Sequence, residues 1–142
     1  MSDVYAGIDY AKLRRLLREE LVGIELKPPL YNSVSAAGAI VSFIPSTGKY
    51  PVLVVFQGTT DTDGNTMELQ VLDVGGVWRT FLKVRFLGKT AFAIGFPALK
   101  LDKVNVAGTE YGVTAGDGAT VTLRAVVGGS GVWECMLWVG EG

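Results

Sequence analysis

The sequence predicts a mainly β protein: an antiparallel β-sandwich or barrel of about eight short strands, preceded by one N-terminal amphipathic helix on an extended arm. Short apolar stretches follow one another after residue 33, and in some of them apolar and polar residues alternate. Glycine-rich turns separate these stretches. A helical apolar period occurs only near the N-terminus. The chain has 142 residues, which is enough for one domain with a buried core.

The predicted helix covers residues 9–21, DYAKLRRLLREEL, with Asp9 as N-cap and Gly23 as stop signal. One face carries leucines and the other arginines: Leu13, Leu16, Leu17 and Leu21 against Arg14, Arg15 and Arg18. Three turns are marginal for an isolated helix in water, so we expect this helix to lie on another surface. The leucines would dock into an apolar groove, and the arginines would face acidic groups. Either the helix anchors an assembly, or it folds back to plug an open end of its own β-body.

An arm follows the helix. Residues 24–33, IELKPPLYNS, contain Pro28 and Pro29, which favour an extended, stiff passage and remove two amide donors. The predicted organisation is therefore a helix and proline-stiffened arm over residues 1–33 and a β-body over residues 34–142. We expect removal of residues 1–27 to leave a folded body that no longer holds its partner.

The strands of the body are predicted from apolar stretches bounded by turn residues. They cover residues 34–44, 51–56, 67–74, 77–87, 90–96, 98–106, 119–127 and 131–139. Alternation along 77–87 places Arg79, Lys83 and Arg85 on one face as a basic ridge, most simply a solvated face. Both faces of 131–139 are apolar, which predicts burial on both sides, under another part of the fold or under a second subunit.

Composition favours association. Lys and Arg number 13 and Asp and Glu 14, a net charge of −1 that argues against global attraction to nucleic acid or to a membrane surface. Charged residues make up 19% of the chain, below the roughly 25% of ordinary domains. Either other subunits cover part of the surface, or the surface is rich in uncharged Gly, Ser and Thr. We see no membrane-spanning run and no secretory signal, and the lone Cys135 is consistent with production in a reducing cytoplasm.

No catalytic, cofactor or metal site is predicted, and we expect the protein not to be an enzyme. The chain has no histidine, which excludes Ser-His-Asp and Cys-His chemistry and leaves Cys135 as a small buried hydrophobe. The DTDGN segment, residues 61–65, matches a calcium loop only in part, and GKT at 88–90 lacks the upstream glycine of a phosphate loop; both are predicted hairpin turns. Candidate carboxylates are scattered: Glu68, Asp73, Glu110 and Glu134.

In overall plan and size, from Met1 to Gly142, the chain resembles the small decoration (cement) proteins of tailed-bacteriophage heads. Several of these are β-rich trimers with an N-terminal arm over the capsid lattice. The resemblance implies a structural virion protein on the capsid exterior, made in the host cytoplasm. It would bind the assembled lattice and stabilise it as a homotrimer, with itself and the major capsid protein as partners. The alternatives are another virion component (tail, adaptor or fibre tip) and a carbohydrate-binding β-sandwich module that uses Trp78, Trp133 and Trp138.

Overall fold

The computed structural model describes residues 4–5, 8–9 and 23–142. These residues form antiparallel sheets and no helix, so the prediction of a mainly β protein is confirmed. Residues 10–22, which carry nearly all of the predicted helix, lie outside the described residues. The leucines and arginines proposed as an assembly interface belong to this segment.

Two sheets make up the body. The strand order of the first is β5 (Gly38–Phe43), β12 (Leu123–Gly128), β7 (Thr66–Leu72) and β8 (Trp78–Arg85). The order of the second is β3 (Glu25–Leu26), β13 (Trp133–Glu141), β6 (Pro51–Thr60) and β9 (Thr90–Lys100), and β4 (Leu30–Val34) also pairs with β13. Two small hairpins complete the fold: β1 (Val4–Tyr5) with β2 (Ile8–Asp9), and β10 (Lys103–Val106) with β11 (Thr109–Gly112).

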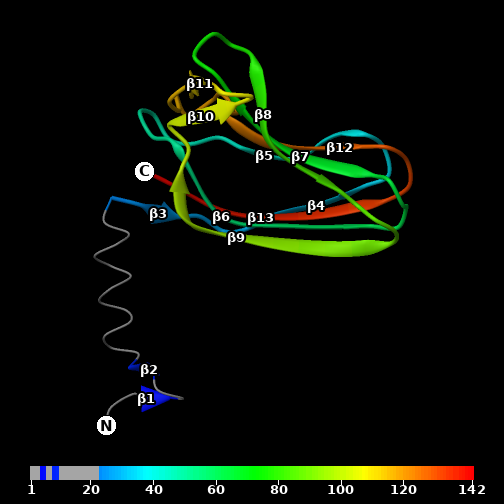
Figure 1. Ribbon diagram of the computed structural model, residues 1–142. Coiled ribbons are helices and arrows are strands. Elements are labelled where there is room, and N and C mark those ends of the chain that lie inside the picture. The colour runs from blue at the N-terminus through cyan, green and yellow to red at the C-terminus, as the bar shows by residue number, and fades with distance from the viewer. Residues whose placement is uncertain (1–3, 6–7, 10–22) are drawn as a thin grey trace.

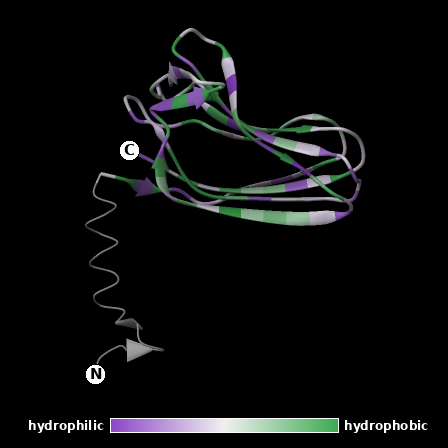
Figure 2. Ribbon diagram, viewed as in Figure 1, coloured by the Kyte–Doolittle hydropathy of each residue, from purple (hydrophilic) through white to green (hydrophobic). Residues whose placement is uncertain are grey.

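The four-stranded and five-stranded sheets face each other in a sandwich-like arrangement (Figure 1). Apolar residues alternate with polar ones along several strands (Figure 2), and the inward side chains form the core. The fully buried members include Phe56 and Leu137 from one sheet and Met67, Leu69 and Leu123 from the other. Cys135 is buried among them as predicted, and desolvation raises the pKa of its thiol to about 12.

Consecutive strands mostly belong to different sheets. The chain changes sheet between β4 and β5, β5 and β6, β6 and β7, β8 and β9, and β12 and β13. The prediction that residues 61–65 and 88–90 form hairpin turns is therefore wrong, because each segment joins strands of opposite sheets. The reason is that β6 packs across the core on β7 instead of pairing with it: Gly58 of β6 lies against the side chain of Met67.

Each of the eight predicted ranges contains a strand, but several boundaries differ. The range 34–44 is divided, because the chain bends between Val34 and Gly38, where Gly38 has a φ of 135°. The predicted arm contains β3 and β4, both paired with β13. Lys27 also bonds to Glu141 at 3.4 Å, so residues 25–27 make contacts with the body, and a truncation should stop at residue 22.

A β-bulge in β8 divides the predicted basic ridge. Leu69 of β7 lies opposite Leu82, but the next residue, Gln70, lies opposite Thr80, so Phe81 has no partner on β7. The extra residue reverses the alternation. Arg79 consequently lies on the core side of the sheet, whereas Lys83 points outward and pairs with Glu68 at 3.4 Å. The prediction of one basic face is wrong.

Gly58 provides a test of the packing between the sheets. A Cβ at this position would lie 2.7 Å from both Phe92 Cε1 and Met67 Sδ, closer than real contacts allow. We expect Gly58→Ala to destabilise the protein by about 1–3 kcal/mol, because the neighbours must shift inside a packed core. Urea unfolding measures the change.

The matched control is Gly95→Ala on the adjacent strand, where an added Cβ would meet nothing within 4 Å. We expect a change within about 0.5 kcal/mol for this exposed site. Equal destabilisation by the two substitutions would contradict the close approach at Gly58.

Candidate functional site

The candidate site is the surface of the five-stranded sheet that points away from the core, here called the outer face. Residues opposite one another in an antiparallel pair share a face. Met136 of β13 lies opposite Tyr31 of β4 and Gln57 of β6, and Trp138 lies opposite Val55. The outer face is therefore centred on Tyr31, Val55, Gln57, Met136 and Trp138, while Trp133, Cys135 and Leu137 point into the core.

The outer face is aromatic and almost uncharged. Tyr31 is 57% exposed and Trp138 is 41% exposed. Trp138 Nε1 donates to Gln57 Oε1 at 3.1 Å, and Tyr31 Oη donates to Glu134 Oε2 at 3.1 Å, a hydrogen bond that raises the pKa of Tyr31. Both polar groups thus have partners within the sheet, and ring surface remains open to solvent. Among the described outward side chains of β4, β13, β6 and residues 90–96, Glu134 alone is charged.

Of the two covers predicted for β13, another part of the fold or a second subunit, the described chain supplies the first on one face only. Both of its faces are apolar, yet only the face with Trp133 and Leu137 is buried by the described part of the chain. Val132 and Trp138 are each 41% exposed. Within residues 23–142 no second layer covers the outer face, so the apolar residues on it have no packing role that the described fold explains.

A shallow hollow of about 180 Å³ lies on the outer face. Tyr31, Gln57, Thr59, Glu134 and Met136 contribute to its lining. An aromatic ring, an amide, a hydroxyl and a carboxylate therefore border one depression, a mixture of groups that can contact both the apolar faces and the hydroxyls of a small polar ligand.

The three tryptophans do not form a common platform. Trp133 is buried in the core, and Trp78 lies on the outward side of the other sheet under the guanidinium of Arg124, 4.0 Å from the ring centroid. Trp138 alone belongs to the outer face. A sugar-binding surface built on all three, one of the predicted alternatives, is excluded by these positions.

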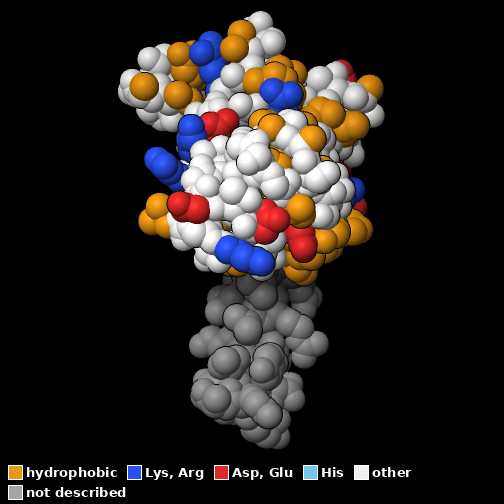
Figure 3. Space-filling model, turned by 90° about the vertical axis from the view of Figure 1, so that its right-hand side faces the viewer, with side chains coloured by type: hydrophobic (Ala, Val, Ile, Leu, Met, Phe, Trp, Pro, Cys, Tyr) orange, Lys and Arg blue, Asp and Glu red, His pale blue; other side chains and the backbone are white. Residues whose placement is uncertain are grey.

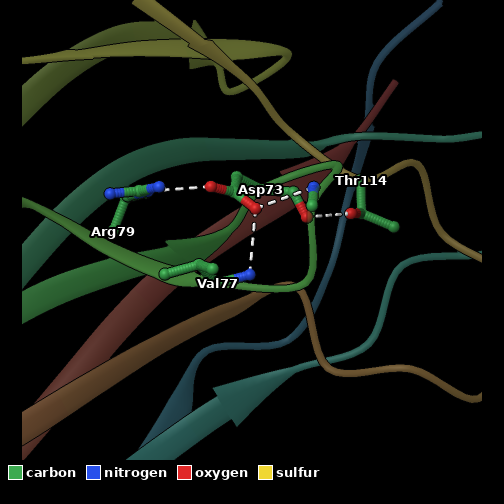
Figure 4. Close-up of polar contacts among 5 residues, drawn as sticks. Asp73, Val77, Arg79 and Thr114 are labelled. Carbon is green, nitrogen blue, oxygen red and sulfur yellow. Dashed lines mark hydrogen bonds and ion pairs between the residues drawn. The ribbon is translucent and has the colours of Figure 1, made fainter. Parts of the chain in front are cut away.

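Asp73 is the centre of the best-connected polar cluster outside this face (Figure 4). The residue is 4% exposed, and its Oδ1 accepts hydrogen bonds from the amides of Gly75 and Val77 at 2.8 and 2.9 Å. Its Oδ2 accepts from Arg79 Nε at 2.7 Å, and its carbonyl accepts from Thr114 Oγ1 at 2.7 Å. These contacts fix the β7–β8 turn, so this candidate carboxylate has a structural role.

The carboxylates of the acidic loop at residues 61–65 accept hydrogen bonds from backbone amides of the same chain. Asp61 Oδ1 accepts from the amide of Val132 at 2.8 Å, and Asp63 Oδ1 accepts from the amide of Gly88 at 2.6 Å. Within the described residues, no group of three or more His, Cys, Asp or Glu side chains is placed to hold a metal ion. At this end of the sandwich, acidic and basic side chains are interspersed on a largely uncharged surface (Figure 3).

Of the residues predicted from the sequence as an assembly interface, none belongs to the described part: Leu13, Leu16, Leu17, Leu21, Arg14, Arg15 and Arg18 all fall within 10–22. Sequence reasoning missed Tyr31, Gln57 and Trp138 as a group, although the two apolar faces of residues 131–139 were a usable signal. No helix in the described residues has the length and apolarity needed to cross a membrane. Comparison of the sequence with models of known protein families and with curated proteins finds no match to either.

The Asp73 cluster predicts an acid-dependent stability. Hydrogen bonds from the Val77 amide, and then from Arg79, hold the pKa of Asp73 below its ordinary value. The cluster therefore stabilises the fold above a pH of about 4, and this contribution is lost as the pH falls through the lowered pKa. We expect Asp73→Asn to lower the urea midpoint at neutral pH, and the difference from wild type to shrink in acid. A difference that stays constant between about pH 7 and pH 3 would contradict this role.

Proposed function

We propose that the chain is a non-enzymatic structural protein of a virion, which binds the assembled capsid lattice and stabilises it. The observation that carries the proposal is the outer face. Exposed apolar patches on small proteins mark interaction sites, and interface centres are rich in Tyr, Trp and Met and poor in charge. Tyr31, Met136 and Trp138 supply those residue types on one sheet surface, where Glu134 is the single charged residue among the described outward side chains of β4, β13, β6 and residues 90–96.

The mechanism of stabilisation is mass action. A protein that binds the assembled shell but not its free subunits shifts the equilibrium toward the shell. The broad face of a five-stranded sheet is better suited than an enclosed site to contact the junction between two capsid subunits. The resemblance to phage-head decoration proteins in plan and size supports the same reading.

The N-terminal segment would add a second contact. The chain enters the body at β3, where Lys27 pairs with Glu25 at 3.2 Å and with Glu141 at 3.4 Å. Glu141 is 1% exposed and also accepts from the amide and hydroxyl of Ser46, both at 2.7 Å. The described chain is therefore fixed to the body from residues 25–27 onward, and the predicted leucine face within residues 10–22 would engage a neighbouring subunit.

A substitution on the outer face tests the proposal. We expect Trp138→Glu to weaken co-sedimentation with assembled shells of the major capsid protein from the same virion by about tenfold or more, because it places a charge at the centre of the contact. The matched control is Leu87→Glu, which adds the same charge at an apolar side chain that is 81% exposed in the β8–β9 connection. Shell binding that is equally strong for wild type and both variants would refute the proposal.

A second candidate function is sugar binding in the hollow of the outer face. Tyr31 offers a ring for stacking, and Gln57, Thr59 and Glu134 offer hydrogen-bonding groups around it. In that case, adding a glycan should change the tryptophan fluorescence through Trp138, and Trp138→Phe should remove most of the change. Absence of any fluorescence change across a panel of bacterial surface glycans would count against this candidate and leave capsid binding unaffected.

A further inference from the structure

The edge strand β9 differs from every other edge of the sandwich. It pairs with β6 on one side, and on its other side it pairs with no strand of the described chain. Its residues from Thr90 to Leu99, TAFAIGFPAL, include no charge. The pairing with β6 is in unbroken register from Thr90 to Gly95, and the irregularity comes later, where Pro97 and Ala98 lie and Ala98 has a φ of 50°.

The remaining edges carry the features that prevent strands from pairing with other chains: charges, bulges, prolines and short length. Edge strand β8 carries Lys83 and Arg85 and is bulged at Phe81. The β3–β4 edge is interrupted by Pro28 and Pro29. Edge strand β5 is bulged at Ile40 in its pairing with β12, and the carbonyl of Ile40 accepts a hydrogen bond from Asn32 Nδ2 at 2.9 Å. Among the edges of the two sheets in the described part of the chain, the stretch from Thr90 to Phe96 alone lacks such protection.

The side chains of this stretch are also incompletely covered. Ala91, Ala93 and Gly95 are exposed and small, so a neighbouring strand would meet no bulky group on that side. Phe92, Ile94 and Phe96 are only half-buried. The Phe92 ring is nevertheless fixed, because it packs edge-on against Phe56 with centroids 4.9 Å apart and lies 5.5 Å from Phe86. The edge is therefore ordered in advance of any partner.

We propose that this edge pairs with the β9 strand of a second copy of the chain, antiparallel and about a two-fold axis near Ala93. An antiparallel pair of identical strands satisfies the free backbone groups on both copies, and the absence of charge from Thr90 to Leu99 removes repulsion between them. The register that matches Thr90 with Phe96 places Ala93 opposite Ala93. It also places Phe92 beside the second copy's Ile94, so that both half-buried side chains lose further exposed surface.

This pairing does not rest on the virion function, and it predicts a different symmetry from the trimer that the resemblance implies. The test is the solution mass by light scattering coupled to size exclusion. We expect two chains for the wild type and one chain for Ala93→Lys, because two like charges would meet at the axis. The matched control is Ala39→Lys on β5, an exposed alanine on another strand, which should keep two chains.

Mixing identifies the partner strand. Ala93→Lys and Ala93→Glu should each be monomeric, and an equal mixture should return to two chains, because opposite charges then meet. This recovery also shows that both variants are folded. A monomeric wild type, a mass of three chains, a two-chain mass unchanged in Ala93→Lys, or a mixture that stays monomeric would overturn the pairing. None of these results would contradict the binding of a single chain to capsid shells through its outer face.

Discussion

The fold depends on the apolar contact between its two sheets, because most strands of each sheet pair with strands that are distant in the chain, with the β7–β8 hairpin as an exception. Strands β6 and β13 form the centre of one sheet, with Phe56 opposite Leu137, and β6 packs across the core on β7, the next strand along the chain. Most strand-to-strand connections therefore cross the core, so neither sheet can form from consecutive hairpins alone. Buried polar groups close the ends: Asn65 donates to Thr60 Oγ1 and to the Ser130 carbonyl at 2.8 and 2.7 Å, and Glu141 accepts from Ser46.

The sequence predicted the strands well and their partners poorly. Every predicted stretch contains a strand, because apolar runs between glycine-rich turns report burial directly. The same turn residues occur in hairpin turns and in connections between two sheets. Local signals therefore do not show which of these two connections residues 61–65 form. The bulge at Phe81 leaves no mark in the alternation of residues 77–87, so this alternation predicts the wrong face for Arg79. From the sequence, the outer face could be predicted only in part, as the second apolar face of residues 131–139. Tyr31 and Gln57 come next to this strand through pairing between distant segments, which no local pattern reports.

The charged side chains, which are few in the sequence, can be related to contacts in the structure. Several of the charged side chains that the structure describes are used inside the chain: Arg79 bonds to Asp73, Lys27 to Glu141, and Lys83 to Glu68. Asp61 accepts a hydrogen bond from the Val132 amide, and Asp117 accepts from the Thr120 hydroxyl and from loop amides, and these bonds hold the pKa of each carboxylate below its ordinary value. These charges stabilise turns and edges. The outer face and the β9 edge are left nearly without charge, and both are suited to contact with protein more than with free ions or nucleic acid.

The two surfaces are compatible with one another because they use different parts of the same sheet. Pairing through β9 would employ the backbone groups at the sheet edge and would leave the outer face unobstructed. Ala93 lies opposite Gln57 on β6, which in turn lies opposite Met136 on β13. A second copy added at β9 would therefore continue the outer face across the axis, with Trp138 of each copy on the same side of one extended sheet. Two copies would then present a larger apolar surface to a lattice than either alone, so self-pairing would strengthen shell binding through multivalency without any additional contact.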